Sequence, residues 1–71
     1  MKRTALLKSI AKRAKEVDVP WSQAARSKGP HDKYECGSLA VAVPRHAEIN
    51  EITAESIMKQ LEPELGERWW K

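Results

Sequence analysis

His31, His46 and Cys36 are the side chains of this 71-residue chain best suited to acid–base or nucleophilic chemistry. His31 stands among cations, because Lys28 precedes it by three positions and Lys33 follows it by two. An imidazole titrates near neutral pH and can move a proton, and nearby ammonium groups can hold a phosphate and offset transition-state charge. RNA carries its own nucleophile, the 2′-hydroxyl, so this grouping suits metal-independent cleavage of an RNA phosphodiester.

Each of these three residues also has a structural interpretation. The spacing alone favours His31 as an ordinary exposed histidine in a turn. His46 is better explained as a loop or cap residue hydrogen-bonded to backbone than as a second RNA contact, and Cys36 as a small core residue than as a nucleophile. Since they are the only soft ligands of the chain, we expect neither a zinc site nor a cofactor.

Length and composition predict one small domain over residues 1–71. A domain of this size has little apolar surface to spare, so chemistry should take place on an open face or in a shallow groove. The single cysteine cannot form an intrachain disulfide, which fits a reducing compartment. No apolar run approaches the ~18 residues of a membrane span, and no secretory signal is evident. We therefore expect a cytoplasmic protein without a membrane partner.

The charge is unevenly distributed along the chain. Residues 1–34 hold nine basic and three acidic side chains, for a net charge of +6, whereas residues 35–71 hold four basic and seven acidic ones, for −3. A basic half favours a polyanion such as nucleic acid. A solvated helix face explains the same excess equally well.

The first half of the chain predicts a helix and a strand. Leu7, Ile10, Ala14 and Val17 recur at helical spacing, with Leu6 widening their face, and predict a helix over residues 4–17. Pro20 ends this segment. Residues 21–26 are expected to form a first strand, and residues 27–30 form a loop marked by Gly-Pro.

A hairpin is predicted over residues 31–36 and 39–43, because Gly37-Ser38 between them suits a type II′ turn. This register pairs Cys36 with Leu39, Tyr34 with Val41 and Asp32 with Val43. Side chains alternate along a strand, so one face becomes buried and the other open. The buried face holds Tyr34, Cys36, Leu39, Val41 and Val43, and the open face holds His31, Lys33, Glu35, Ala40 and Ala42.

A second helix is predicted over residues 53–61, with Thr53 as N-cap and Glu55 in the first turn. Its apolar stripe is Ala54, Ile57, Met58 and Leu61. Pro63 and Gly66 are expected to end it.

The aromatic residues divide into two groups. We interpret Trp21 and Tyr34 as core aromatics rather than as platforms for base stacking. Trp69 and Trp70 either form an interface or fold back over the small core. The sequence also leaves open whether residues 66–71 form a flexible tail.

These elements give an α+β domain of order α-β-β-β-α. Two amphipathic helices should pack on one face of a three-stranded antiparallel sheet, leaving His31 and Lys33 on the open face. This layout resembles the double-stranded-RNA-binding fold.

Three segments resemble the HicA family of toxins from bacterial toxin–antitoxin pairs. Residues 26–34 (RSKGPHDKY) resemble its Gly-x-His-x-x-aromatic segment, residues 43–49 (VPRHAEI) its Val-Pro-x-His stretch, and residues 53–61 its closing helix. The resemblance covers roughly residues 6–65. Many relatives have Ser directly before the histidine, where this chain has Pro30.

The resemblance implies an endoribonuclease that cleaves mRNA, with His31 catalytic, and a HicB-type antitoxin that inhibits it. We expect RNA contacts from Arg26, Lys28, Gly29 and Lys33, and a monomer that joins its antitoxin in a hetero-oligomer. The alternatives are a non-catalytic double-stranded-RNA-binding module and an inert domain held by an antitoxin-like partner.

Overall fold

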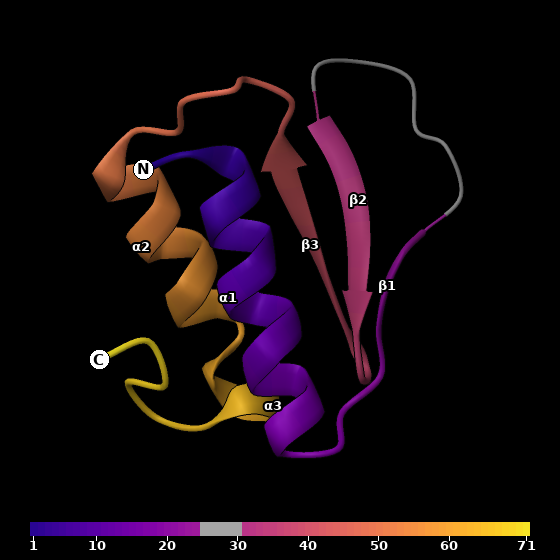
Figure 1. Cartoon of the computed structure of the whole chain (residues 1–71). Coiled ribbons are helices and arrows are strands. Elements are labelled where there is room, and N and C mark those ends of the chain that lie inside the picture. Colours follow the sequence, from indigo (N-terminus) through magenta and orange to yellow (C-terminus); the bar gives the residue numbers. More distant parts are fainter. Residues whose placement is uncertain (25–30) are drawn as a thin grey trace.

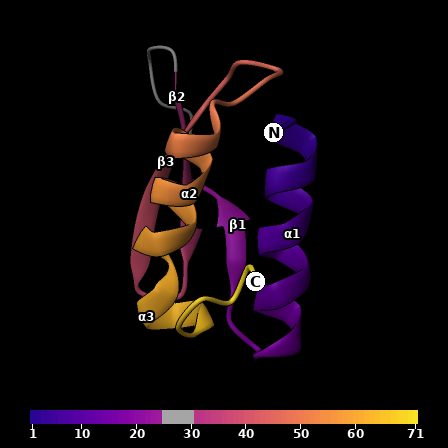
Figure 2. The same cartoon turned by 90° about the vertical axis from the view of Figure 1, so that its left-hand side faces the viewer.

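The helices and strands follow the order that the sequence predicts, with one short helix added after the last of them. The computed structural model describes residues 1–24 and 31–71. Its elements are α1 (Arg3–Glu16), β1 (Trp21–Gln23), β2 (His31–Cys36), β3 (Leu39–Pro44), α2 (Glu51–Gln60) and α3 (Glu62–Leu65). The strands form one antiparallel sheet in the order β1-β2-β3, and α1 and α2 cover the same face of it (Figure 1, Figure 2). The α+β prediction with a three-stranded antiparallel sheet is confirmed.

Helix α1 faces the sheet through a row of residues spaced by four. Leu6, Ile10 and Ala14 are buried, whereas Leu7 and Val17 are only partly buried at its flanks. The predicted helix is confirmed, but its inner face is rotated toward Leu6. Side chains at i and i+4 lie one above the other, and only contact with the sheet decides which such row points inward.

The β2–β3 hairpin has the predicted register. Cys36 pairs with Leu39 and Tyr34 with Val41. Gly37 has a φ of 59°, and Ser38 is not among the described residues with positive φ, which fits the first position of a type II′ turn. A Cβ at position 37 would also lie 2.6 Å from Glu64 Cδ, so a larger residue would displace the Glu64 side chain, while the positive φ is what favours glycine there.

Strand β1 is shorter than the predicted 21–26. It ends at Gln23, and the Ala24 amide still donates to the Lys33 carbonyl at 2.8 Å. Residues 25 and 26 lie outside the described part of the chain. Trp21 and Tyr34 stack at 4.9 Å with an interplanar angle of 8°, and Tyr34 belongs to the core. Their interpretation as core aromatics is confirmed.

The two faces of the hairpin differ as the alternation predicts. On the side facing the helices, Tyr34, Cys36, Val41 and Val43 are buried and Leu39 is half-buried. On the opposite side, His31, Lys33, Glu35, Ala40 and Ala42 are exposed and Pro44 is half-buried.

Helix α2 begins earlier than predicted. Its N-cap is Asn50, whose side-chain oxygen accepts a hydrogen bond from the Ile52 amide at 2.8 Å, and Glu51 is the acid in the first turn. The predictions of Thr53 as N-cap and Glu55 in the first turn are therefore wrong. Asn and Thr are both good caps, and Asn50 opens the helix one turn sooner. The predicted buried stripe of Ala54, Ile57, Met58 and Leu61 is confirmed.

Helix α2 ends at Gln60, and the predicted breaker Pro63 does not end the helical part of the chain. Pro63 lies in the first turn of α3, where its missing amide hydrogen costs no helical bond, and Gly66 ends this helix with a φ of 101°. The tail then turns back. Trp69 and Trp70 are half-buried against the core, and the Trp69 Nε1–H donates to the Met58 carbonyl at 2.9 Å.

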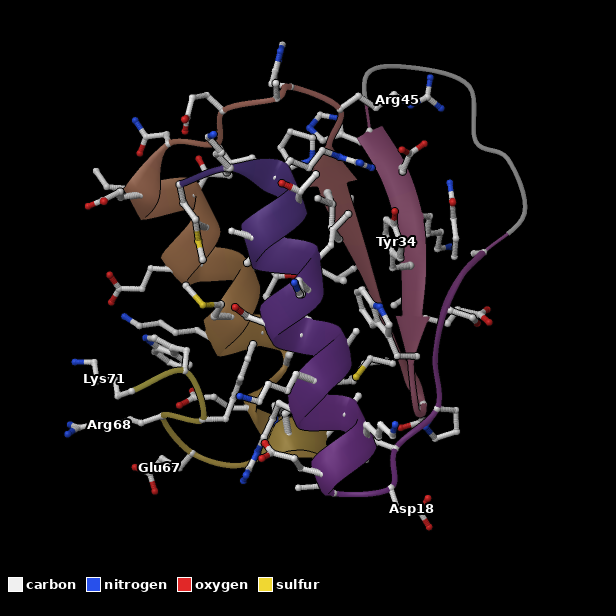
Figure 3. The ribbon with its side chains drawn as sticks, in the orientation of Figure 1. Asp18, Tyr34, Arg45, Glu67, Arg68 and Lys71 are labelled. Atoms are coloured by element: carbon white, nitrogen blue, oxygen red, sulfur yellow. The ribbon has the colours of Figure 1, made fainter. Side chains whose placement is uncertain are left out.

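Of the two alternatives for the tryptophans, the structure supports the one in which they cover the core. Their rings meet edge to face at 5.9 Å. Figure 3 shows Glu67, Arg68 and Lys71 pointing outward from the same tail. Within residues 1–24 and 31–71, no helix combines the length and apolar character needed to cross a bilayer.

Helix α3 is hydrogen-bonded to the hairpin turn through the Glu64 carboxylate. Glu64 Oε1 accepts hydrogen bonds from the Ser38 hydroxyl at 2.6 Å and the Ser38 amide at 3.0 Å. These two bonds lower the pKa of Glu64 below its ordinary 4.5. A carboxyl group whose pKa is lower in the folded state than in the unfolded state stabilises the fold at pH values above its unfolded-state pKa. That stabilisation is lost as the pH falls through the folded-state pKa.

We expect Glu64→Gln to lower the melting temperature at pH 7, and the gap from wild type to close as the pH falls below 4.5. Thermal denaturation followed by circular dichroism from pH 7 to pH 3 measures both. Glu67→Gln is the control, because Glu67 is exposed in the tail. A gap that is constant across this pH range would contradict the assigned role of the charge.

Candidate active site on the open face of the sheet

His31 is the first residue of β2 and lies opposite Pro44 of β3. Its side chain is exposed on the face of the sheet that the helices leave uncovered. Lys33 is exposed on the same face, two residues along the strand, which places the two Cα atoms roughly 7 Å apart. The predicted location of this pair is confirmed.

The other predicted RNA contacts, Arg26, Lys28 and Gly29, lie outside the described residues, as does Pro30. Their roles stay predictions. Lys33 is therefore the predicted RNA contact that the structure places beside His31.

A groove of about 340 Å³ is lined by His31 together with residues of β3 and α2. The strand contributes Ala42 and Pro44. The helix contributes Ile52, Thr53, Ser56 and Gln60. His31 thus shares a concave surface with hydroxyl, amide and apolar side chains.

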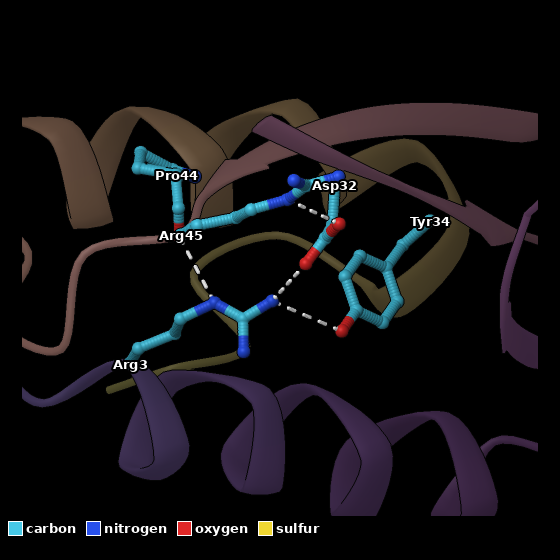
Figure 4. A network of polar contacts seen from close by, with 5 residues as sticks. All are labelled: Arg3, Asp32, Tyr34, Pro44 and Arg45. Atoms are coloured by element: carbon cyan, nitrogen blue, oxygen red, sulfur yellow. Dashed lines mark hydrogen bonds and ion pairs between the residues drawn. The ribbon is translucent and has the colours of Figure 1, made fainter. Parts of the chain in front are cut away.

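A cluster of charged side chains fixes the backbone on the other side of the same strand (Figure 4). Asp32 points toward the helices and is 16% exposed. Its Oδ2 accepts a hydrogen bond from Arg3 Nη2 and its Oδ1 from Arg45 Nε, both at 2.7 Å. Arg3 also donates to the Tyr34 hydroxyl at 3.3 Å and to the Pro44 carbonyl at 2.9 Å.

This cluster joins three elements around the candidate catalytic residue. Arg3 belongs to α1, Asp32 to β2, and Pro44 ends β3. His31 is both the chain neighbour of Asp32 and the cross-strand partner of Pro44, so the cluster holds its backbone from both strands.

Cys36 is a core residue, as predicted. It is fully buried and pairs with Trp21 and Leu39. Burial, and secondly the charge of Glu64, raise the pKa of its thiol above 9.0. The thiol is therefore neutral at pH 7 and a poor nucleophile.

His46 is exposed in the loop between β3 and α2. It is not among the side chains that line the groove at His31. Its expected hydrogen bond to backbone stays a prediction.

The described basic residues of the first half of the chain do not share one surface. Lys8, Lys12 and Lys15 are exposed on α1, which lies on the covered side of the sheet (Figure 2). Lys33 is on the open side with His31. An RNA strand at His31 would therefore meet Lys33 directly, and would have to pass around the edge of the sheet to reach the α1 lysines.

Acidic side chains are not gathered at the open face. Asp32 and Glu35 project from opposite faces of β2, as the register predicts, and Asp32 is engaged by two guanidinium groups. Among the described residues, no three His, Cys, Asp or Glu side chains are arranged to hold a metal ion.

Comparisons of the chain with protein-family models, curated proteins and solved structures found no match.

Two parts of the site were not identified from the sequence. The sequence does contain an indication of the Asp32 cluster. The alternation that buries Tyr34 and Cys36 also turns Asp32 inward, and a carboxylate there requires cationic partners. The sequence contains no such indication of the α2 side of the groove, since periodicity shows which residues of a helix are exposed but not which strand they face.

We expect Asp32→Ala to lower the free energy of unfolding by about 1–3 kcal/mol, because it leaves the half-buried Arg3 guanidinium without its anion. Arg45 is 46% exposed, so Arg45→Ala should cost less than about 1 kcal/mol. Urea denaturation measures both values.

The matched control is Glu35→Ala, which removes an exposed carboxylate from the same strand and should change stability by less than about 0.5 kcal/mol. An Asp32→Ala variant as stable as the Glu35→Ala variant would show that the cluster does not fix the strand.

Proposed function

We propose that this chain is a HicA-type toxin, a cytoplasmic, metal-independent endoribonuclease that cleaves mRNA and is inhibited by a HicB-type antitoxin. The observation that carries the proposal is His31. The residue that the family resemblance marks as catalytic is exposed, lines a groove, and lies on a fixed strand beside Lys33. An acid–base residue needs this combination of access to substrate and a rigid support.

The proposed chemistry uses the nucleophile of the RNA. The 2′-hydroxyl attacks the adjacent phosphorus, and the bond from phosphorus to the 5′-oxygen breaks. The products are a 2′,3′-cyclic phosphate and a 5′-hydroxyl. His31 makes one of the two proton transfers and water makes the other. Either neutral His31 takes the 2′-hydroxyl proton while water protonates the departing 5′-oxygen, or the His31 imidazolium protonates the 5′-oxygen while water takes the 2′-hydroxyl proton. The Lys33 ammonium offsets charge on the phosphate.

The fold is proposed to be of the double-stranded-RNA-binding kind. This is supported by the order α-β-β-β-α and by the helices sharing one face of the sheet. Because the groove is open, inhibition by an antitoxin is best explained by steric cover of the sheet face.

The alternative is a non-catalytic double-stranded-RNA-binding module. One observation favours it, which is that α1 exposes Lys8, Lys12 and Lys15 away from His31. The two proposals differ in their dependence on His31, because binding through α1 would not require it.

We expect His31→Ala to lower the rate of RNA cleavage by about 10²–10⁴-fold while the circular dichroism spectrum stays native. The same substitution should relieve growth arrest when the chain is expressed without an antitoxin. His46→Ala is the control, since it removes an exposed histidine outside the groove. Cleavage by His31→Ala at the wild-type rate would refute the assignment and favour the binding module.

We expect cleavage to continue in EDTA, because Asp32 and Glu35 face opposite sides and cannot act as a pair at one metal. A 2′-deoxy substitution at the cleaved position of an oligoribonucleotide should abolish cleavage there, since it removes the nucleophile. Electrophoresis of labelled oligonucleotides measures both effects. Activity that EDTA removes and magnesium restores would overturn the mechanism.

A further inference from the structure

The α2 side of the groove carries a row of polar side chains. Ser56 and Gln60 are four residues apart and Thr53 precedes Ser56 by three, so they follow one side of the helix. All three are exposed and line the groove. The neighbouring stripe of α2, which includes Ile57, is buried against the sheet and fixes the direction in which this polar row points.

The chemistry of the lining suits one anionic, hydrogen-bonding ligand. Of the described residues in the lining, none carries a carboxylate, and His31 is the one with an imidazole. Pro44 and Ile52 supply apolar surface, and Ile52 is 80% exposed. A phosphate beside His31 would therefore meet no repulsion inside the groove, while a flat ring could lie against the apolar residues.

The size of the groove limits what it can hold. Its volume of about 340 Å³ is at the low end of the roughly 300–1,000 Å³ typical of ligand pockets. It suits a single nucleotide rather than a folded segment of protein or a duplex.

We propose that this groove binds the nucleotide next to the scissile phosphodiester, and that Gln60 reads its base as adenine. That the neighbouring phosphodiester is cleaved rests on the proposed ribonuclease function. The nucleotide site itself is argued from the lining and the size of the groove. A glutamine amide offers one donor and one acceptor side by side, which matches the N6 and N7 edge of adenine. Unpaired bases that turn out of a single strand are the usual targets of sequence-specific RNA recognition.

Gln60 then determines specificity without taking part in bond breaking. His31 acts on the proton, and Gln60 fixes which base enters with the phosphate. Ser56 and Thr53 add hydroxyls that can pair with the ribose or with the base edge.

Binding is tested first, without cleavage. Adenosine 3′-monophosphate and cytidine 3′-monophosphate are titrated separately into the ¹⁵N-labelled full chain. We expect amide shifts at residues 53, 56 and 60 and tighter binding of the adenosine nucleotide. Gln60→Ala should reduce the ratio of the two affinities by roughly tenfold. Gln60→Glu should weaken the binding of both nucleotides, because it places a carboxylate in the groove.

The matched control is Gln23→Ala, since Gln23 is the other glutamine of the chain and is exposed on β1. Its nucleotide affinities should equal those of wild type. Shifts confined to the α1 lysines, or equal affinity for the two nucleotides in wild type, would overturn the proposed site.

Cleavage is tested second, with oligoribonucleotides that place each of the four bases beside a single cleavage position. Wild type should favour adenine there, and Gln60→Ala should reduce the preference by roughly tenfold while still cleaving. An unchanged preference in Gln60→Ala would refute the reading role. Selective adenosine binding with no cleavage by wild type would refute the ribonuclease proposal alone and leave the nucleotide site supported.

Discussion

The Asp32 carboxylate, held between two guanidinium groups, is the contact on which the geometry of the open face depends. It is 16% exposed, so without partners it would be costly to place on the inner side of the sheet. Arg3 and Arg45 provide those partners, and Arg3 also reaches the carbonyl that ends β3. The first turn of α1, the start of β2 and the end of β3 are thereby fixed to one another. His31, on the outer side of the same backbone, takes its position from that fixed point, although it makes none of these contacts.

The candidate site lies at the surface because the interior has no room for one. Leu6, Ile10, Val43, Leu61 and Leu65, each at most 1% exposed, fill the space between sheet and helices. A domain of this size cannot enclose a cavity without giving up part of that core. The groove at His31 is formed instead by the outer edges of two packed elements, with short side chains on β3 and polar ones on α2. A rigid core and an accessible site are therefore compatible, because they use opposite sides of the same strands.

How well the sequence predicted each contact depended on how far apart its residues are along the chain. The Gly37-Ser38 turn and the alternation after it specify the hairpin register, and every predicted pair is present. The start of α2 was misplaced because Asn50 and Thr53 are both acceptable caps, and only the position of the preceding loop distinguishes them. The inner face of α1, the return of Trp69 onto Met58 and the partners of Asp32 all depend on segments far apart in the chain. Local patterns do not specify such contacts, so these features required the structure.

The burial of Leu61 and Leu65 has a consequence for biosynthesis. Both side chains lie in the same core as Leu6, and Glu64 closes the hairpin turn from the same segment. The hairpin can form early, since its strands are neighbours in sequence, but the core cannot close until the chain as far as Leu65 has left the ribosome. A nascent chain that ends before this segment lacks the support that fixes its sheet. Synthesis of the chain through this segment therefore precedes the first folded molecule, and any activity of the open face begins only after that delay.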